Sequence, residues 1–197
     1  MKNSADKHIL TSASCVKDCN DFVVVIGMRA STKDEAHIGH AHPGYDSSSH
    51  LNDIGIVEMD SPIQFGSELL YFLNIANCSS IQNAFFIGDA QPICLPKNND
   101  YVGKMALSSG YAGIINVLYS NLTILEQNKC EGMRDFTVCT NEICYCETGT
   151  GAPLMLPGPA YEQVGINSFA TYGPCTGAPK RFTAVYPYLE WISSVIE

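Results

Sequence analysis

The sequence predicts an all-β fold, an antiparallel barrel or sandwich, with one helix at its C-terminal end. Short apolar or alternating runs recur along the 197 residues, and turn-forming Gly and Pro residues separate them. Regularly spaced runs of this kind are typical of antiparallel β proteins. Hydrophobic residues make up 46% of the chain, which is enough to fill a substantial core.

Five runs rich in β-branched and aromatic residues carry the strand prediction. In chain order they span residues 22–28, 54–59, 111–118, 163–170 and 181–186. Pro187 suits a helix start, and the apolar residues after it fall at the offsets of one helical face: Tyr188, Trp191, Ile192, Val195 and Ile196. The segment 66–88 is apolar and almost uncharged, but follows neither a strand nor a helix period. A packed hairpin is one interpretation of it.

The charge balance excludes several classes of partner. Eleven Lys and Arg against twenty Asp and Glu give a net charge of -9. A chain this acidic offers no basic face for phosphates, so we expect no nucleic-acid partner. No apolar run reaches the ~20 residues that cross a bilayer, and we expect no membrane partner either.

The cysteine content indicates an oxidising compartment. The chain has nine cysteines, and the odd number leaves at least one unpaired within the chain. Asn77 and Asn121 each begin an Asn-X-Ser/Thr tripeptide, and both are candidate glycosylation acceptors that agree with secretion. Residues 1–10 hold no apolar core of signal-peptide length. We therefore expect a secreted protein whose signal lies upstream, the alternative being a chain that is not exported.

Four blocks resemble the trypsin-like, chymotrypsin-fold serine proteases, in the family's order and across nearly the whole chain. HILTSASCV at 8–16 is similar to the turn that carries the catalytic histidine. HPGYDSSSHLNDIGIVEMDSPIQF at 42–65 is similar to the segment around the catalytic aspartate, and it leads to QPICLP at 91–96. CETGTGAPL at 146–154 is similar to the nucleophile loop, and residues 165–192 to the C-terminal segments. The resemblance implies one peptidase domain over 1–197, a chymotrypsin-like double β-barrel with a C-terminal α-helix.

The chain departs from the family pattern in two places. The family's first strands and IVGG start have no counterpart, which implies an incomplete first barrel. The segment 66–88 has no counterpart either, and it is either a real insertion or the product of a retained intron or wrong gene model.

Placed on the family's catalytic triad, the chain has Ser14 at the histidine position, Asp53 at the aspartate position and Thr150 at the nucleophile position. Acyl transfer needs a base, which a neutral imidazole supplies and a serine hydroxyl does not. Thr150 keeps a hydroxyl, but its extra methyl restricts the rotamer. The resemblance therefore implies a degenerate site, in which Asp53 accepts hydrogen bonds, for example from Ser14 and Ser168.

The loop and pocket around the triad are also altered. Gly149 stands where the family has the aspartate that pairs with the processed N-terminus, and Thr148 stands at the glycine that donates an oxyanion amide. No acid occupies the pocket floor to receive Lys or Arg, so a residual cleft would prefer small apolar groups or be closed. The pocket positions are Cys144, Tyr145, Ser168, Phe169 and Ala170.

The resemblance pairs Cys130 with Cys139 and Cys146 with Cys175. It leaves open the pairing of the other five cysteines, namely Cys15, Cys19, Cys78, Cys94 and Cys144. Three histidines have a spacing that could hold a metal, but no cysteine or carboxylate completes the set. They are His37, His40 and His42. We expect a polar loop there, with no metal and no cofactor.

Together these observations predict an inactive serine protease homologue that acts by binding, as a decoy or regulator of a proteolytic cascade. Its partner would be a protease, an inhibitor or another cascade component. Two alternatives stay open: a serine endopeptidase with residual or unrecognised activity, and a non-functional gene fragment.

Overall fold

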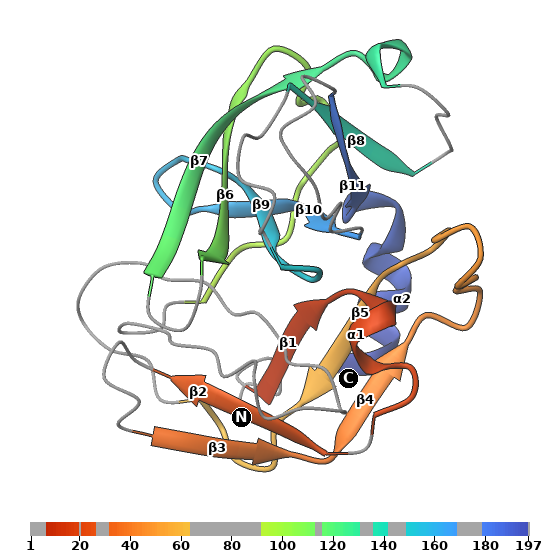
Figure 1. Ribbon diagram of the computed structural model, residues 1–197, viewed down its shortest axis with the longest axis vertical. Coiled ribbons are helices and arrows are strands. Elements are labelled where there is room, and N and C mark those ends of the chain that lie inside the picture. The colour runs from red at the N-terminus through yellow and green to blue at the C-terminus, as the bar shows by residue number, and fades with distance from the viewer. Residues whose placement is uncertain are drawn as a thin grey trace.

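The computed structural model describes residues 7–19, 21–26, 32–63, 92–112, 116–130, 136–141, 149–168 and 179–196. Strands dominate these residues, and Figure 1 shows those of the C-terminal half above those of the N-terminal half, with the C-terminal helix α2 beside them. The expected all-β, chymotrypsin-like fold with a C-terminal helix is confirmed. None of the described helices is long and apolar enough to cross a membrane.

The N-terminal half contains one sheet and one hairpin. The sheet has the order β1-β5-β4 and the hairpin pairs β2 with β3. The bounds are β1 (His8–Thr11), α1 (Ala13–Val16), β2 (Phe22–Ile26), β3 (Thr32–Ala36), β4 (Ile38–Ala41) and β5 (Gly55–Glu58). Val16, Phe22 and Val57 are among the residues of a shared apolar cluster. In this part of the described chain the strands form an open sheet and a hairpin rather than a closed barrel.

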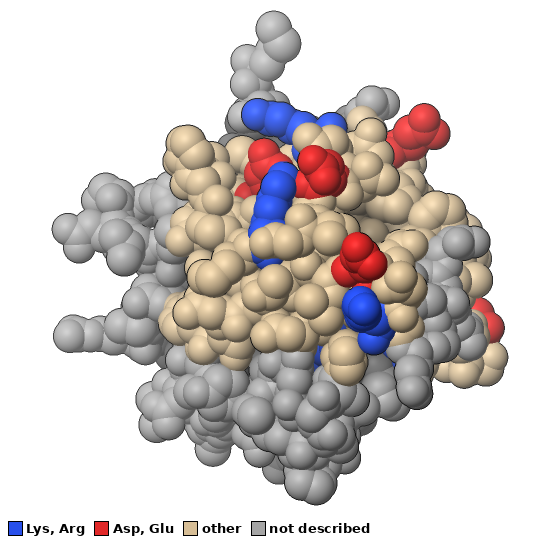
Figure 2. Space-filling model, turned by 90° about the horizontal axis from the view of Figure 1, so that it is seen from above, with Lys and Arg blue, Asp and Glu red and all other residues tan. Residues whose placement is uncertain are grey.

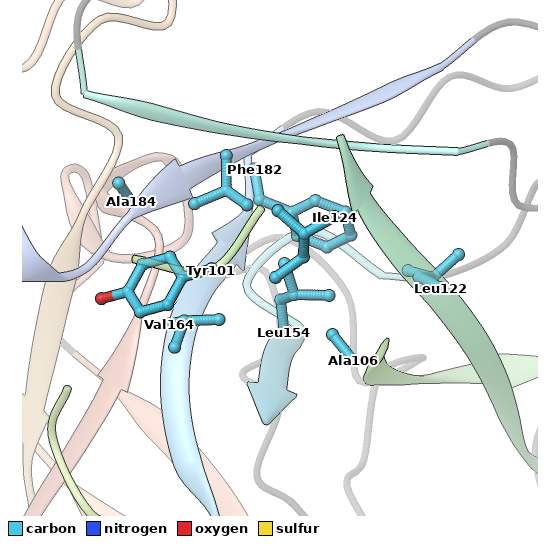
Figure 3. Close-up of a cluster of buried hydrophobic side chains, with 9 residues drawn as sticks. Tyr101, Ala106, Leu122, Ile124, Leu154, Val164, Phe182 and Ala184 are labelled. Carbon is cyan, nitrogen blue, oxygen red and sulfur yellow. The ribbon is translucent and has the colours of Figure 1, made fainter. Parts of the chain in front are cut away.

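The C-terminal half is a closed barrel of six antiparallel strands with the order β10-β11-β8-β7-β6-β9. The bounds are β6 (Met105–Ala112), β7 (Asn116–Leu125), β8 (Thr137–Thr140), β9 (Pro153–Leu156), β10 (Glu162–Asn167) and β11 (Lys180–Ala184), with a 3-10 turn η2 (Gln127–Lys129) before β8. Figure 3 shows side chains from different strands, among them Leu122, Leu154 and Phe182, gathered inside the barrel. Alternation along each strand places such residues inward.

A third cluster joins the two halves. Ile56 of β5 and Ile54, just before that strand, pack with Ile166 of the barrel and with Ile192 of α2. This helix (Leu189–Ile196) follows the 3-10 turn η3 (Tyr186–Tyr188). All four isoleucines are buried. The C-terminal helix α2 therefore packs, through this cluster, on residues 54–56 of the N-terminal half.

The expected secondary structure agrees with the structure except at one run. Residues 22–28, 54–59, 163–170 and 181–186 contain strands, and the helix follows Pro187. The run 111–118 is not one strand but the end of β6 and the start of β7. Alternation alone does not reveal a reversal of chain direction. The segment 66–88 lies outside the described residues.

Charges on the molecule are interspersed rather than gathered by sign. Figure 2, which looks onto the barrel end of the molecule, shows Lys and Arg side chains lying beside Asp and Glu side chains, separated by uncharged surface. On the described part of this face there is no basic patch of the kind that binds nucleic acid.

Candidate active site

Asp53 is the centre of the candidate site. It lies two residues before β5 (Gly55–Glu58), and it is 0% exposed. Its Oδ1 accepts a hydrogen bond from the backbone N–H of Ser14 at 2.7 Å, and its Oδ2 accepts one from Ser14 Oγ at 3.0 Å. Oδ2 also accepts a bond from Ser168 Oγ at 2.7 Å. The structure thus brings together Ser14, Asp53 and Ser168.

The elements around Asp53 explain this convergence. Ser14 belongs to α1, a single turn directly after β1, and Ser168 directly follows β10 of the barrel. β1 pairs with β5 in antiparallel register, with Thr11 opposite Gly55, and this places the turn beside Asp53. Asn52 has a φ of 55°, in the left-handed region that asparagine tolerates better than most residues. The backbone reversal at Asn52 leads the chain into its buried position at Asp53.

Burial raises the pKa of Asp53, because a carboxylate without water is destabilised in its charged form. The Ser14 N–H, the Ser168 hydroxyl and the Ser14 hydroxyl oppose that shift, as does the nearby His50. The groups that contact the carboxylate are therefore one amide and two hydroxyls. None of these three groups is a base at neutral pH.

Ser14 has no capacity to act as a base in this arrangement. Its Oγ lies 3.0 Å from Asp53 Oδ2 and 3.2 Å from Ser12 Oγ. A hydroxyl carries one proton and cannot take up a second near pH 7. At the position that the family resemblance assigns to the general base, this chain therefore has a hydroxyl that forms hydrogen bonds but does not accept a proton.

The loop at Thr150 is held by β10. Gly151 has a φ of 89°, which favours glycine. Its N–H donates to the Asn167 carbonyl at 2.7 Å, and the Asn167 N–H donates to the Ala152 carbonyl at 2.7 Å. Asn167 Nδ2 donates to the Gly149 carbonyl at 3.2 Å. The buried Asn167 side chain is therefore bonded to the backbone at Gly149, the position where the resemblance implies that an ion pair has been lost.

Asn167 is a site residue that the sequence interpretation missed. It ends β10, directly after Val164, Gly165 and Ile166, and an amide that closes such a run is a signal that could have been used. The carbonyl to which its Nδ2 donates, that of Gly149, is brought near only by the pairing of β9 with β10 in the barrel.

Cys15 links the two loops of the candidate site and was also missed in this role. Its Sγ accepts a bond from Ser12 Oγ at 3.0 Å and lies 3.5 Å from the Thr150 carbonyl oxygen, to which it can donate. Burial raises the pKa of Cys15 to about 11, and the charge of Asp53 acts in the same direction. The thiol stays protonated at neutral pH, and it is not an activated nucleophile.

Tyr188 and Trp191, from the C-terminal segment, wall the site on the side of His42. The His42 ring packs edge-on against both aromatic rings, with 5.2 Å between centroids in each case. Tyr188 Oη donates to Asn52 Oδ1 at 2.8 Å. Burial raises the pKa of Tyr188 to about 12, with Asp53 as the second cause, and burial lowers the pKa of His42. His42 therefore serves packing here.

The three histidines considered for a metal point to different partners. His37 Nδ1 lies 2.7 Å from Asp60 Oδ2, and His40 Nε2 lies 3.6 Å from Glu58 Oε2. Within the described ranges, no three His, Cys, Asp or Glu side chains form a set that could hold a metal ion.

The cysteines fall into three groups. Cys130 and Cys139 form a disulfide with an S–S distance of 2.03 Å, and this pair was expected from the resemblance. Cys19 is also disulfide-bonded, whereas Cys15 and Cys94 are free. The expected pair of Cys146 and Cys175 lies outside the described residues. So do six other positions singled out from the sequence and the Asn77 acceptor, the six being Cys78, Cys144, Tyr145, Thr148, Phe169 and Ala170.

Comparisons with known proteins agree with this geometry. A family model described as trypsin matches residues 4–192. Chymotrypsin-2 of Vespa crabro is 26% identical over 208 residues, which cover 94% of this chain and 84% of the relative. Chymotrypsin of Phaedon cochleariae is 26% identical over 95% of this chain and 68% of its own. The solved structure of HL collagenase has a similar fold, with a TM-score of 0.75 at 19% identity over 96% of this chain and 82% of that one.

Proposed function

Because this chain belongs to the trypsin family of serine proteases, we propose that it is a catalytically inactive member that acts by binding other proteins. The observation that carries the proposal is the environment of Asp53. Its carboxylate is contacted by Ser14 and Ser168, where the family mechanism needs an imidazole between carboxylate and nucleophile. Neither of these two serines can take the proton from an attacking hydroxyl.

The nucleophile position supports the same conclusion. Thr150 retains a hydroxyl, but its loop neighbour Gly149 lacks the carboxylate that the resemblance expects for the ion pair with a processed N-terminus. The structure fastens this loop through Asn167 instead. Residues 149–152 are therefore bonded to β10, although the carboxylate that would take part in activation is missing at Gly149.

A fluorophosphonate probe, which labels activated serine-type nucleophiles, tests the loss of activity. We expect no labelling of the unmodified chain and none of Thr150→Ser, because members of a catalytic triad act as a unit and single repairs do not add up. The matched restoring set is Ser14→His, Gly149→Asp and Thr150→Ser together with a processed N-terminus. Stoichiometric labelling of Thr150 in the unmodified chain would show instead a serine-type endopeptidase with an unrecognised base.

We assign the binding role to the extracellular space. The nine cysteines and the Cys130–Cys139 disulfide support this assignment, since such bonds persist where conditions are oxidising. The partner class is a protease, a protease inhibitor or another component of a proteolytic cascade, and no nucleic acid or membrane is involved.

Titration calorimetry against a panel of protein inhibitors of trypsin-family enzymes tests this role. We expect at least one to bind without being cleaved and without covalent attachment. A folded chain that binds neither the inhibitors nor active proteases of the family would contradict it, and an unfolded chain would indicate a non-functional gene fragment.

A further inference from the structure

We propose that Asn121 carries an N-linked glycan and that this glycan covers an apolar patch on the outer face of β6 and β7. The patch, called here the β6–β7 patch, consists of Met105, Leu107 and Tyr119. The inference rests on the extracellular location proposed above, because glycans of this kind are added in the secretory pathway.

The acceptor tripeptide has the geometry of a surface site. Leu122 is buried in the barrel core, so its neighbours Asn121 and Thr123 point outward from β7. Asn121 is exposed and Thr123 is half-buried. Within the described ranges, neither the Asn121 amide nor the Thr123 hydroxyl has a hydrogen-bond partner. Attachment of a sugar at Asn121 would therefore break no hydrogen bond among the described residues.

There is room for a bulky group at this point of the barrel. β6 pairs with β7 along its length from Met105 to Ala112, whereas β8 pairs with β7 only at Ile124 and Leu125. Asn141, which follows β8, still exchanges hydrogen bonds with Thr123, and at Asn121 itself no described strand lies along that flank of β7. Figure 1 shows β7 on the outer margin of the barrel. A glycan on this outward-facing side chain projects away from the core.

The apolar side chains lie directly around the acceptor. In the antiparallel register Leu107 is opposite Asn121, and Met105 is opposite Thr123. Tyr119 lies two residues before Asn121 and so on the same face of β7. Met105 is 59% exposed and Tyr119 is 42% exposed. Opposite side chains on such a pair have Cβ atoms roughly 5 Å apart, and a contiguous exposed apolar patch indicates that something covers it.

The occupant that the position favours is the sugar attached at its centre. The C–H faces of a pyranose pack on aromatic and aliphatic side chains, while its hydroxyls stay in water. In the transfer, Asn121 Nδ2 forms a bond to the anomeric carbon of an oligosaccharide held on a lipid pyrophosphate. The bond between that carbon and the pyrophosphate oxygen breaks, the amide loses one proton to the medium, and the lipid pyrophosphate leaves. No oxidant or reductant is needed.

Expression behind a supplied signal peptide in a eukaryotic host tests the site independently of the natural location. In an Asn77→Gln background, Asn121 is the one Asn-X-Ser/Thr acceptor left in the sequence. We expect peptide-N-glycosidase to convert Asn121 to Asp in the secreted protein, as read by mass spectrometry of the peptide. Thr123→Ala should abolish the glycan and Thr123→Ser should retain it. A secreted, folded chain without a glycan at Asn121 would overturn the inference and leave the proposed binding function untouched.

A second measurement tests the covering role. Removal of the glycan under native conditions should increase the binding of a hydrophobic dye, and the Thr123→Ala chain should bind as much dye as the trimmed protein. Replacing Met105 and Tyr119 by Ser should abolish the increase. Equal dye binding before and after removal would show that the glycan is present but covers nothing.

Discussion

At the scale of single residues, Asp53 combines complete burial with a full set of donors. Two oxygens receive three hydrogen bonds, from the Ser14 N–H, the Ser14 hydroxyl and the Ser168 hydroxyl. Hydrogen bonds to a charged group are stronger than those between neutral groups, but burial still dominates and raises the pKa. Burial therefore destabilises the charged form of Asp53, and the free energy of unfolding depends on whether the carboxyl is protonated.

The Asp53→Asn variant removes the titrating carboxyl, so comparison with it shows how Asp53 changes the free energy of unfolding with pH. A raised folded-state pKa means that the fold binds the proton more tightly than the unfolded chain does. The stability linked to this proton is fully present below the unfolded pKa near 3.8 and is lost as the pH rises through the raised value. We expect the free energy of unfolding of the unmodified chain, relative to Asp53→Asn, to fall in urea titrations as the pH rises above about 3.8 and through the raised pKa.

Asp46 provides a matched control with the opposite sign. Hydrogen bonds from Ser49 and Ser48 lower the pKa of this exposed residue to about 2. Its contribution is present above the unfolded pKa and is lost as the pH falls through the lowered value. The slope for Asp46→Asn should therefore run the other way. A flat or rising difference for Asp53→Asn would mean that the hydrogen bonds outweigh burial.

Cys15 should react slowly with alkylating reagents. With a pKa raised from 9.0 to about 11, its thiolate fraction near pH 8 is about 100-fold lower than that of an unperturbed thiol. Peptide mapping after a short iodoacetamide pulse should therefore show Cys94, which is exposed and free, alkylated well before Cys15. The two should react alike in urea, and equal rates in the folded chain would contradict the burial of Cys15.

At the scale of elements, α1 lies so close to β5 that no side chain larger than that of glycine fits at Gly55. A Cβ at Gly55 would lie 2.7 Å from Val16 Cγ2 and 2.9 Å from the Ser12 carbonyl oxygen. The second contact is with backbone, so it cannot be relieved by a rotamer change. The glycine fixes how near the turn with Ser14 lies to the strand that follows Asp53.

Gly55→Ala should destabilise the chain by about 1 to 3 kcal/mol, the range for overpacking in a filled core. It should also shift Ser14 away from the Asp53 carboxylate, which thermal unfolding and the pH slope described for Asp53 would reveal together. Gly158→Ala is the matched control, because its Cβ would meet only the Ala160 carbonyl oxygen, at 3.1 Å, in an exposed bend. A cost at Gly55 no larger than at Gly158 would show that α1 adjusts freely.

At the scale of the whole molecule, the two halves share one apolar cluster through Ile54, Ile56, Ile166 and Ile192. Among the described strands, the sheet of the first half is open and the barrel of the second half is closed. The open half therefore depends on contacts made by the far end of the chain. This arrangement predicts that the halves unfold together.

Ile192→Ala tests that dependence. Truncation of a buried isoleucine costs about 2 to 5 kcal/mol, and we expect a matching loss in urea unfolding. Fluorescence of Trp191, the one tryptophan of the chain, and far-ultraviolet circular dichroism should report a single shared midpoint before and after the change. Glu190→Ala, on the exposed side of α2, should change stability by no more than about 0.5 kcal/mol. Two separated transitions would contradict the coupling.

The sequence predicts those elements whose pattern lies within one segment, and it does not predict contacts between segments that are far apart in the chain. The strands β5, β10 and β11 and the helix α2 carry their pattern within one segment, and the sequence predicts them. β3 has the sequence TKDEA, which has no strand pattern, and its extended form comes from pairing with β2. The family resemblance indicated Ser14, Asp53 and Ser168, but the fastening of the Thr150 loop by Asn167 and Cys15 arises only when distant segments close together.

The position of α2 along the chain has a consequence for biosynthesis. A ribosome makes residues 54–56 long before it makes Leu189–Ile196, so Ile54 and Ile56 have no permanent cover while the chain is growing. Synthesis proceeds at roughly 5 to 20 residues per second, and the uncovered interval therefore lasts for seconds. During that time these two side chains lack their partner Ile192, and the shared cluster can close only after the helix has been made.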